Sequence, residues 1–287
     1  GQLRDEHAQS AVPRHRHTDW SLRDQVGDRR ACANSTSAKR VAAPGACVVA
    51  CVANNEGARS AEDDLRELAG PVHSLSKNKC RVFWTVVDPA RIDPARVAAW
   101  LDLDAPRRIA DGRFLSRPGL FAWDRLDAAS QLLVEHLPTD LRGHGADLGA
   151  GYGYLAAEVC ARNPAVTAMD LYEAEARALE LARSNLAAAA PGMACEFFWH
   201  DVSTGLSRHY DFIVSNPPFH VGRRDAPDLG RAFIAAAAQA LNPGGRLFLV
   251  ANRHLPYEQV LDATFARVRT VAVRDGFKLI EASKGPA

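Results

Sequence analysis

The sequence lacks a strong charge imbalance, a metal-binding cysteine pattern and a long apolar run. Its 35 Lys and Arg residues nearly balance 34 Asp and Glu residues, for a formal net charge of +1, so contact with nucleic acid has to depend on local basic patches. The six cysteines form no Cys-x-x-Cys pair and no His-x3-His spacing accompanies them, which argues against a structural zinc site. No apolar run approaches the roughly 18 residues of a membrane span, and the N-terminus shows no charged-then-apolar signal pattern. We therefore expect a cytoplasmic protein with reduced thiols, no bound metal and no membrane partner.

What is present is the composition of an ordinary globular enzyme. The 287 residues suffice for one large domain or two smaller ones, and 47% apolar with 24% charged residues is typical of such chains. Residues 1–44 differ, because their isolated apolar residues follow no period among Arg, His, Asp, Ser and Ala. We expect this segment to be largely disordered.

From about residue 138 onward, short apolar runs alternate with segments of helical spacing. This alternation predicts an α/β protein with a doubly wound, Rossmann-like, mostly parallel sheet of seven strands. The first expected strand ends at Leu148. The other six cover residues 165–169, 194–199, 212–215, 246–251, 268–273 and 278–282. The expected helices cover residues 124–137, 153–162, 173–188, 228–241 and 257–265.

The same order of elements occurs earlier in the chain. Residues 48–87 read as strand, helix, strand, strand, which is also the order expected for residues 247–282. Asn54 and Asn252 each follow a Val-Ala dipeptide. We therefore expect residues 45–108 to hold the C-terminal part of a second, degenerate copy of the module, followed by a connecting helix at 89–102. A chance likeness is the alternative.

A stiff, proline-rich loop follows the buried strand that ends at Ser215. Asn216-Pro217-Pro218-Phe219 cannot continue a strand, because proline donates no backbone hydrogen bond and fixes φ. The loop offers an amide side chain, bare carbonyls and one aromatic ring at the carboxyl end of a strand, where open α/β sheets bind ligands. Such a set suits the methylation of a planar amine: Asn216 and Pro217 oxygens accept its hydrogens, and Phe219 stacks on its ring. A proline loop whose aromatic residue merely packs is the alternative.

A glycine-rich loop follows the first strand of the expected sheet. Gly149, Gly151 and Gly153 allow positive φ and a close approach of a ligand to the backbone. The dinucleotide fingerprint requires its third glycine where Tyr154 stands, and no phosphate-loop lysine is present. The spacing therefore suits a nucleoside whose charged part is an amino acid, and Asp147 would face its amino group or a bound water. An ordinary turn is the alternative.

Two further acids follow expected strands. Asp170 comes directly after the strand expected at 165–169, where a carboxylate can accept both hydroxyls of a ribose. Asp201 follows the next strand and could meet an adenine amino group. Either acid could also be a solvated residue at a strand end.

Taken together, these motifs resemble the class I S-adenosylmethionine-dependent methyltransferases. The likeness is strongest to the ribosomal RNA guanine-N2 methyltransferases of the small-subunit type, the methyltransferase small domain group, and it covers about residues 109–283. That family carries a degenerate N-terminal copy of its own fold, of which this chain has only the tail. The resemblance implies that residues 109–287 form the catalytic domain and that the chain methylates the exocyclic N2 of a guanine.

The resemblance also implies roles for individual residues. The cofactor-binding set it implies is Asp147, Gly149, Ala150, Gly151, Asp170, Leu171, Asp201, Val202 and Asn216. The catalytic set it implies is Asn216, Pro217, Pro218 and Phe219. Basic residues flank this region and could hold phosphates, although each could equally be solvated: Arg223, Arg224, Arg253 and His254, with Arg113, Arg117 and Arg125 before the first strand.

The expected cofactor is S-adenosyl-L-methionine, and the expected partner is ribosomal RNA or the small ribosomal subunit, with a monomer favoured. Two alternative functions stay open. One is methylation of a glutamine amide or of adenine N6, which uses a related loop. The other is a non-catalytic RNA-binding remnant, suggested by the partial N-terminal copy.

Overall fold

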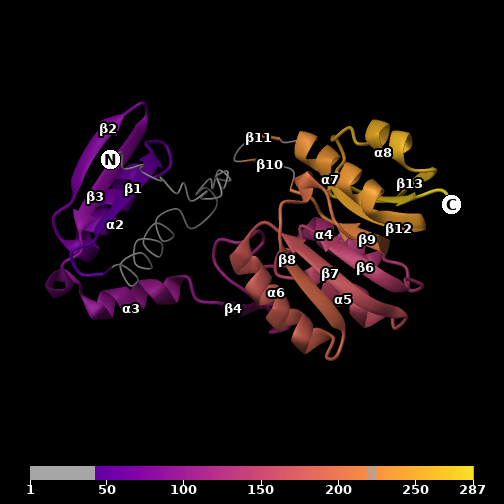
Figure 1. Ribbon diagram of the computed structural model, residues 1–287, viewed down its shortest axis with the longest axis horizontal. Coiled ribbons are helices and arrows are strands. Elements are labelled where there is room, and N and C mark those ends of the chain that lie inside the picture. The colour runs from indigo at the N-terminus through magenta and orange to yellow at the C-terminus, as the bar shows by residue number, and fades with distance from the viewer. Residues whose placement is uncertain (1–42, 219, 222–223, 226, 287) are drawn as a thin grey trace, which may run out of the picture.

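The computed structural model describes residues 43–218 and 227–286, together with the backbone of residues 220–221 and 224–225 (Figure 1). The predicted disorder of residues 1–44 falls almost entirely outside the described residues. None of the helices within these ranges is both long enough and apolar enough to cross a membrane.

A seven-stranded sheet forms the larger part of the molecule, in the order β13-β14-β12-β9-β6-β7-β8. Strands β12, β9, β6, β7 and β8 are parallel, whereas β14 is antiparallel to both β12 and β13. The predicted doubly wound, mostly parallel sheet of seven strands is confirmed. The strands are β6 (Gly143–Leu148), β7 (Val166–Glu173), β8 (Ala194–Trp199), β9 (Tyr210–Ser215), β12 (Leu241–Asn252), β13 (Arg267–Arg274) and β14 (Phe277–Ser283).

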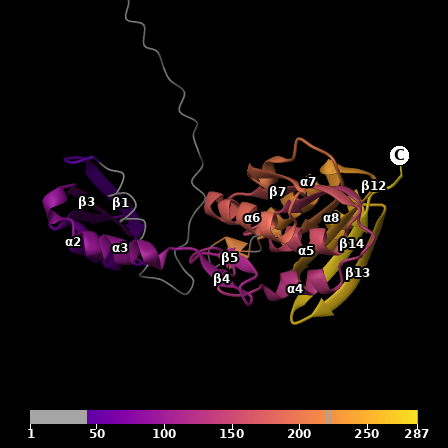
Figure 2. The same cartoon turned by 90° about the horizontal axis from the view of Figure 1, so that it is seen from below.

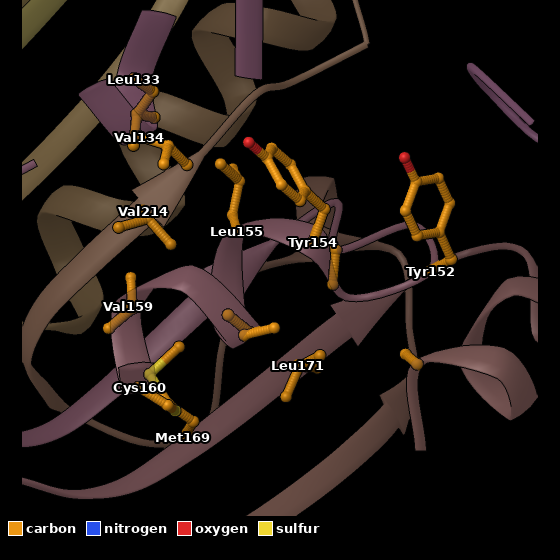
Figure 3. Close-up of a cluster of buried hydrophobic side chains, with 14 of the residues drawn as sticks. Leu133, Val134, Tyr152, Tyr154, Leu155, Val159, Cys160, Met169, Leu171 and Val214 are labelled. Atoms are coloured by element: carbon orange, nitrogen blue, oxygen red, sulfur yellow. The ribbon is translucent and has the colours of Figure 1, made fainter. Parts of the chain in front are cut away.

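Helices cover both faces of this sheet, and each face has its own apolar core. On one face, residues such as Leu133, Leu155 and Val159 pack against Val214 and Leu171 of the strands (Figure 3). On the other face, α7 and α8 pack on a second cluster of buried residues. The helices of the first face are α4 (Ala128–Glu135), α5 (Tyr154–Arg162) and α6 (Ala176–Ala189), and those of the second are α7 (Pro227–Ala240) and α8 (Glu258–Thr264).

A smaller three-stranded sheet repeats the C-terminal part of the larger one. It runs β1 (Cys47–Ala53), α2 (Ala58–Ala69), β2 (His73–Lys77) and β3 (Cys80–Val86), in the order β1-β3-β2. Strands β12, β13 and β14 have the same arrangement, because the last strand of each set lies antiparallel between the other two.

The two sets of strands also share their turns. Each ends in a hairpin closed by two residues with positive φ, 53° and 62° at Asn78-Lys79 and 51° and 82° at Asp275-Gly276. Positive φ at both central residues is the mark of a type I′ turn, which suits the twist of a hairpin. The expected repeat of one module is therefore present in the topology of the chain.

The segment between the two sheets differs from the sequence prediction. The connecting helix expected at 89–102 is present as α3 (Pro94–Leu103), but its predicted start is wrong, because a separate short 3₁₀-helix, η1 (Pro89–Arg91), precedes it. Asp93 caps α3 and Pro94 occupies its first turn, where the missing N–H costs nothing. In Figure 2, α3 leads from the small sheet towards a hairpin that the sequence did not reveal, β4 (Arg107–Ile109) and β5 (Phe114–Ser116).

Candidate active site

The glycine loop and the proline loop lie side by side at the carboxyl ends of β6 and β9. Leu148 and Ser215, the last residues of these strands, are paired in the sheet. The Ser215 hydroxyl donates a hydrogen bond of 2.7 Å to the Leu148 carbonyl. A Cβ added to Gly149 would lie 3.8 Å from the backbone oxygen of Asn216. The two motifs that the sequence singled out thus form one site.

The glycine loop requires its glycines for two different reasons. Gly151 has a φ of 54°, and an added Cβ would meet nothing within 4 Å, so the space beside it is open. Gly153 has a φ of 86°, and its Cβ would meet Leu186 at 2.7 Å. The first glycine therefore leaves room for a ligand, whereas the second lets α5 pack closely against α6.

Asp147 is a fully buried acid beneath this loop. Its Oδ2 accepts a hydrogen bond of 3.1 Å from the Ala156 backbone N–H. Its Oδ1 is buried and has no hydrogen-bond partner among the described residues. Burial raises the pKa of this carboxyl to about 7, and the charge of Glu173 contributes in the same direction. A cationic group placed at Oδ1 would satisfy the unpaired oxygen and stabilise the ionised form.

The prediction that Asp170 lies at the end of its strand is wrong. Strand β7 continues to Glu173, and Asp170 pairs with Ala146 and Glu196 within the sheet. Asp170 is 2% exposed and accepts hydrogen bonds from the Tyr210 hydroxyl at 2.9 Å and from Arg208 at 3.1 Å. These contacts give it a structural role inside the sheet.

The acid at the end of β7 is Glu173. Its Oε2 accepts a hydrogen bond of 2.7 Å from the Gly151 N–H, and its Oε1 accepts one of 2.8 Å from the Glu175 N–H. Burial raises the pKa of Glu173. The sequence contained a signal for this residue, because Leu171 and Tyr172 continue the apolar run of the strand up to it.

The remaining predicted cofactor residues fall into two groups. Asp201 is exposed at the carboxyl end of β8, where it caps the 3₁₀-helix η2 (Val202–Thr204) by accepting from the Ser203 N–H at 2.9 Å. The side chains of Leu171 and Val202 are buried in the two apolar cores, so only their backbones can face a ligand.

The Asn216 side chain is held by its nitrogen. Nδ2 donates to Asp127 Oδ2 and to Ser130 Oγ, both at 2.8 Å. Its Oδ1 is buried and has no partner among the described residues. Pro217 is buried and Pro218 is exposed, and Phe219 lies outside the described residues. A hydrogen-bond acceptor is thus available at the junction of the two loops.

The predicted basic residues are only partly described. Arg253 and His254 are exposed after β12. Arg223 lies outside the described residues, and so does the side chain of Arg224. The three arginines before β6 form ion pairs: Arg113 with Glu158, Arg117 with Asp104, and Arg125 with Asp124. Within the described part of the chain, no three His, Cys, Asp or Glu residues are placed to hold a metal ion.

A mostly parallel seven-stranded sheet with an antiparallel β14, a glycine loop after β6 and a proline loop after β9 defines a class I methyltransferase fold. The chain belongs to the methyltransferase small domain family, which matches residues 111–281. Among solved structures it resembles the T. thermophilus 16S rRNA N2 G1207 methyltransferase (RsmC), which was determined in complex with AdoMet and guanosine. The TM-score is 0.72 at 28% identity, over 90% of this chain and 71% of that one.

Curated proteins of similar sequence are also ribosomal RNA methyltransferases by name. The ribosomal RNA small subunit methyltransferase C of Klebsiella pneumoniae is 35% identical over 227 residues, and that of Salmonella gallinarum is 34% identical over the same length. Each match covers 79% of this chain and 64% of the relative. The chain therefore spans just under two thirds of the length of these curated relatives.

Proposed function

We propose that this chain is an S-adenosylmethionine-dependent methyltransferase that acts on the N2 amino group of a guanine in ribosomal RNA, with the small subunit favoured. In this proposal residues 109–287 are the catalytic domain and residues 45–108 are the partial copy with its connection. The observation that carries the proposal is the unpaired Oδ1 of Asn216, a residue whose backbone oxygen lies beside the glycine loop. The curated relatives named above are ribosomal RNA small subunit methyltransferases, and the similar solved structure is that of a 16S rRNA N2 G1207 methyltransferase.

The residues around the glycine loop fit S-adenosylmethionine. The open space at Gly151 admits a ligand to the backbone, and Asp147 Oδ1 is an unpaired acceptor for the ammonium of a methionine moiety. We infer that Glu173, in place of Asp170, accepts the ribose hydroxyls and that Asp201 meets the adenine. When bound, this cofactor supplies an electrophilic methyl group on a sulfonium.

The proline loop fits an amine that is a weak nucleophile. Asn216 Oδ1 and the Pro217 carbonyl accept the two hydrogens of guanine N2, which turns the nitrogen lone pair towards the methyl group. A buried acceptor without a partner costs about 1–3 kcal/mol, and the amine relieves that cost when it binds. The loop positions the nitrogen, and positioning alone lowers the barrier considerably. No general base is required, because the nitrogen becomes acidic once it is alkylated.

A ribosomal RNA substrate has further consequences. The target base has to leave its stack or lie in an opened loop, where Phe219 could stack on it. Arg253 and His254 are exposed after β12, and Arg223 and Arg224 follow the proline loop in the sequence, so these four residues could hold phosphates. The partner is then ribosomal RNA or the small ribosomal subunit, the location is the cytoplasm, and the chain acts as a monomer without a membrane partner.

The direct test is incubation with methyl-labelled S-adenosylmethionine and separated ribosomal RNA, ribosomal protein and DNA. The proposal predicts label in RNA and, after digestion, N2-methylguanosine as the labelled nucleoside. Label in a glutamine side chain or in N6-methyladenine would replace the proposed substrate with one of the related amines. Cofactor binding without label in any of the three would leave an RNA-binding module.

A further inference from the structure

Asp127 connects the start of α4 to the proline loop, 89 residues further along the chain. One of its oxygens, Oδ2, accepts two hydrogen bonds of 2.8 Å, from the Ser130 N–H and from the Asn216 side-chain nitrogen. The first bond caps α4, as expected for an Asp directly before a helix. The second is not needed by the helix.

These contacts determine which way the Asn216 amide faces. A carboxylate oxygen only accepts hydrogen bonds, so the group that meets Asp127 has to be the nitrogen. The second hydrogen of that nitrogen is directed at Ser130 Oγ, 2.8 Å away. Both hydrogens are therefore used within the protein, and Oδ1 is left free to accept. With the amide reversed, an NH₂ group would face the substrate amine, and two donors would meet.

The bond from a carboxylate also makes Asn216 a stronger acceptor. A charge-assisted hydrogen bond is roughly twice as strong as a neutral one. It draws amide electron density towards the carbonyl oxygen, and hydrogen bonds in series strengthen one another in a low-dielectric site. Asp127 is half-buried and Ser130 is buried, so water weakens this effect only in part.

The support behind Asn216 is rigid. Helix α4 places Ala129, Leu132 and Leu133 in the core, each at most 1% exposed. The Tyr152 hydroxyl of the glycine loop donates to the Arg125 carbonyl at 3.3 Å. The segment before α4 therefore contacts both loops of the site.

We propose that Asp127, together with Ser130, is the positioning pair of the methyl-transfer site: it fixes the Asn216 amide with Oδ1 towards the substrate amine. Asp127 acts through Asn216 and does not touch the substrate. This inference rests on the proposed function, because it assigns a role within that same reaction.

Two substitutions of Asp127 distinguish its role as the N-cap of α4 from its contact with Asn216. Asp127→Ser keeps an N-cap residue but has too short a side chain to reach Asn216. Asp127→Asn keeps both an N-cap and an acceptor oxygen of the right reach. Asp93→Ser is the matched control, because Asp93 caps α3 with bonds of 2.9 and 3.3 Å to Ala95 and Arg96 and does not contact the loop.

With the full-length chain, Asp127→Ser is expected to lower kcat by about tenfold to 100-fold, as loss of supporting groups does elsewhere. The cofactor Kd and the Tm stay close to those of Asp93→Ser. Asp127→Asn restores part of the lost kcat, because it returns the acceptor oxygen without the charge. In an Asn216→Ala background, Asp127→Ser has no further effect, because its route of action is already removed. Undiminished turnover in Asp127→Ser, or additive losses in the double variant, would overturn the proposal.

A second measurement does not depend on turnover. In ¹⁵N-labelled protein, the Asn216 side-chain NH₂ signal is expected to exchange slowly with water and to lose that protection in Asp127→Ser but not in Asp93→Ser. Equal protection in all three proteins would contradict the inference. If the wild-type chain methylates no RNA while this protection behaves as expected, the proposed function fails and the positioning contact stands.

Discussion

The Ser215 hydroxyl donates a hydrogen bond of 2.7 Å to the carbonyl of Leu148. This bond joins the ends of β9 and β6, and the backbone oxygen of Asn216 lies next to the glycine loop. The two halves of the site, one for a nucleoside with an amino acid tail and one for a flat amine, therefore have a fixed separation.

Gly151→Ala is expected to weaken cofactor binding, because the new methyl group enters the open space beside the glycine loop. The matched control is Gly192→Ala, since Gly192 also has positive φ, 85° against 54°, and also has nothing within 4 Å of an added Cβ. Both variants carry similar backbone strain, about 1 kcal/mol. Calorimetry with S-adenosylmethionine should show at least about a tenfold higher Kd for Gly151→Ala alone. Equal affinities for the two variants would contradict the placement of the ligand.

Glu173→Gln is expected to raise the cofactor Kd, because the acid at the end of β7 loses its charge where the ribose hydroxyls donate. A hydrogen bond to a charged group contributes about 1.5–3 kcal/mol, so the loss is roughly tenfold or more. Asp170→Asn serves as the comparison. It should lower stability by removing the charge that meets Arg208 and Tyr210, and it should leave the Kd unchanged. The reverse result would return the ribose role to Asp170.

Asp147→Asn is expected to flatten the pH dependence of stability. The pKa of Asp147 is about 7 in the folded protein and 3.8 ordinarily, so between these values the folded state binds more protons than the unfolded chain. Ionisation of Asp147 therefore lowers the free energy of unfolding as pH rises from about 4 to about 7, by on the order of 4 kcal/mol in total. Urea unfolding at pH 5 and pH 8 should show a smaller difference for the variant than for the wild type. An equal change in the free energy of unfolding between the two pH values in both proteins would show that folding does not raise the pKa of Asp147.

The two loops of the site could be predicted from the sequence more accurately than the ends of the strands and helices around them. The glycine and proline motifs were visible because local backbone chemistry specifies them. The end of β7 was placed too early, although Leu171 and Tyr172 continue its apolar run, and pairing of Glu173 with Trp199 of β8 extends the strand beyond Asp170. Helix α4 begins at Ala128, four residues later than expected, because Asp127 caps it.

Contacts between residues that are distant in the sequence could not be predicted, for a different reason. The bond between Asp127 and Asn216 spans 89 residues, and no periodicity or spacing in one sequence reports such a pair. The unpaired oxygens of Asp147 and Asn216 likewise become visible only when every neighbour is placed. Residue types suggested the chemistry, and the fold was needed to show which atoms are free for it.

The most direct test of the central claim is methyl transfer by Asn216→Ala compared with Asn242→Ala. Asn242 also donates its amide to an aspartate, Asp211 at 2.8 Å, but at the amino ends of β12 and β9, away from the two loops. With labelled S-adenosylmethionine and ribosomal RNA, Asn216→Ala should form at least about 100-fold less N2-methylguanosine, a loss comparable to removal of an oxyanion-hole donor. Its cofactor Kd should stay close to that of the wild type, and Asn242→Ala should remain active. Undiminished N2-methylguanosine formation by Asn216→Ala, beside an active wild type, would contradict the account.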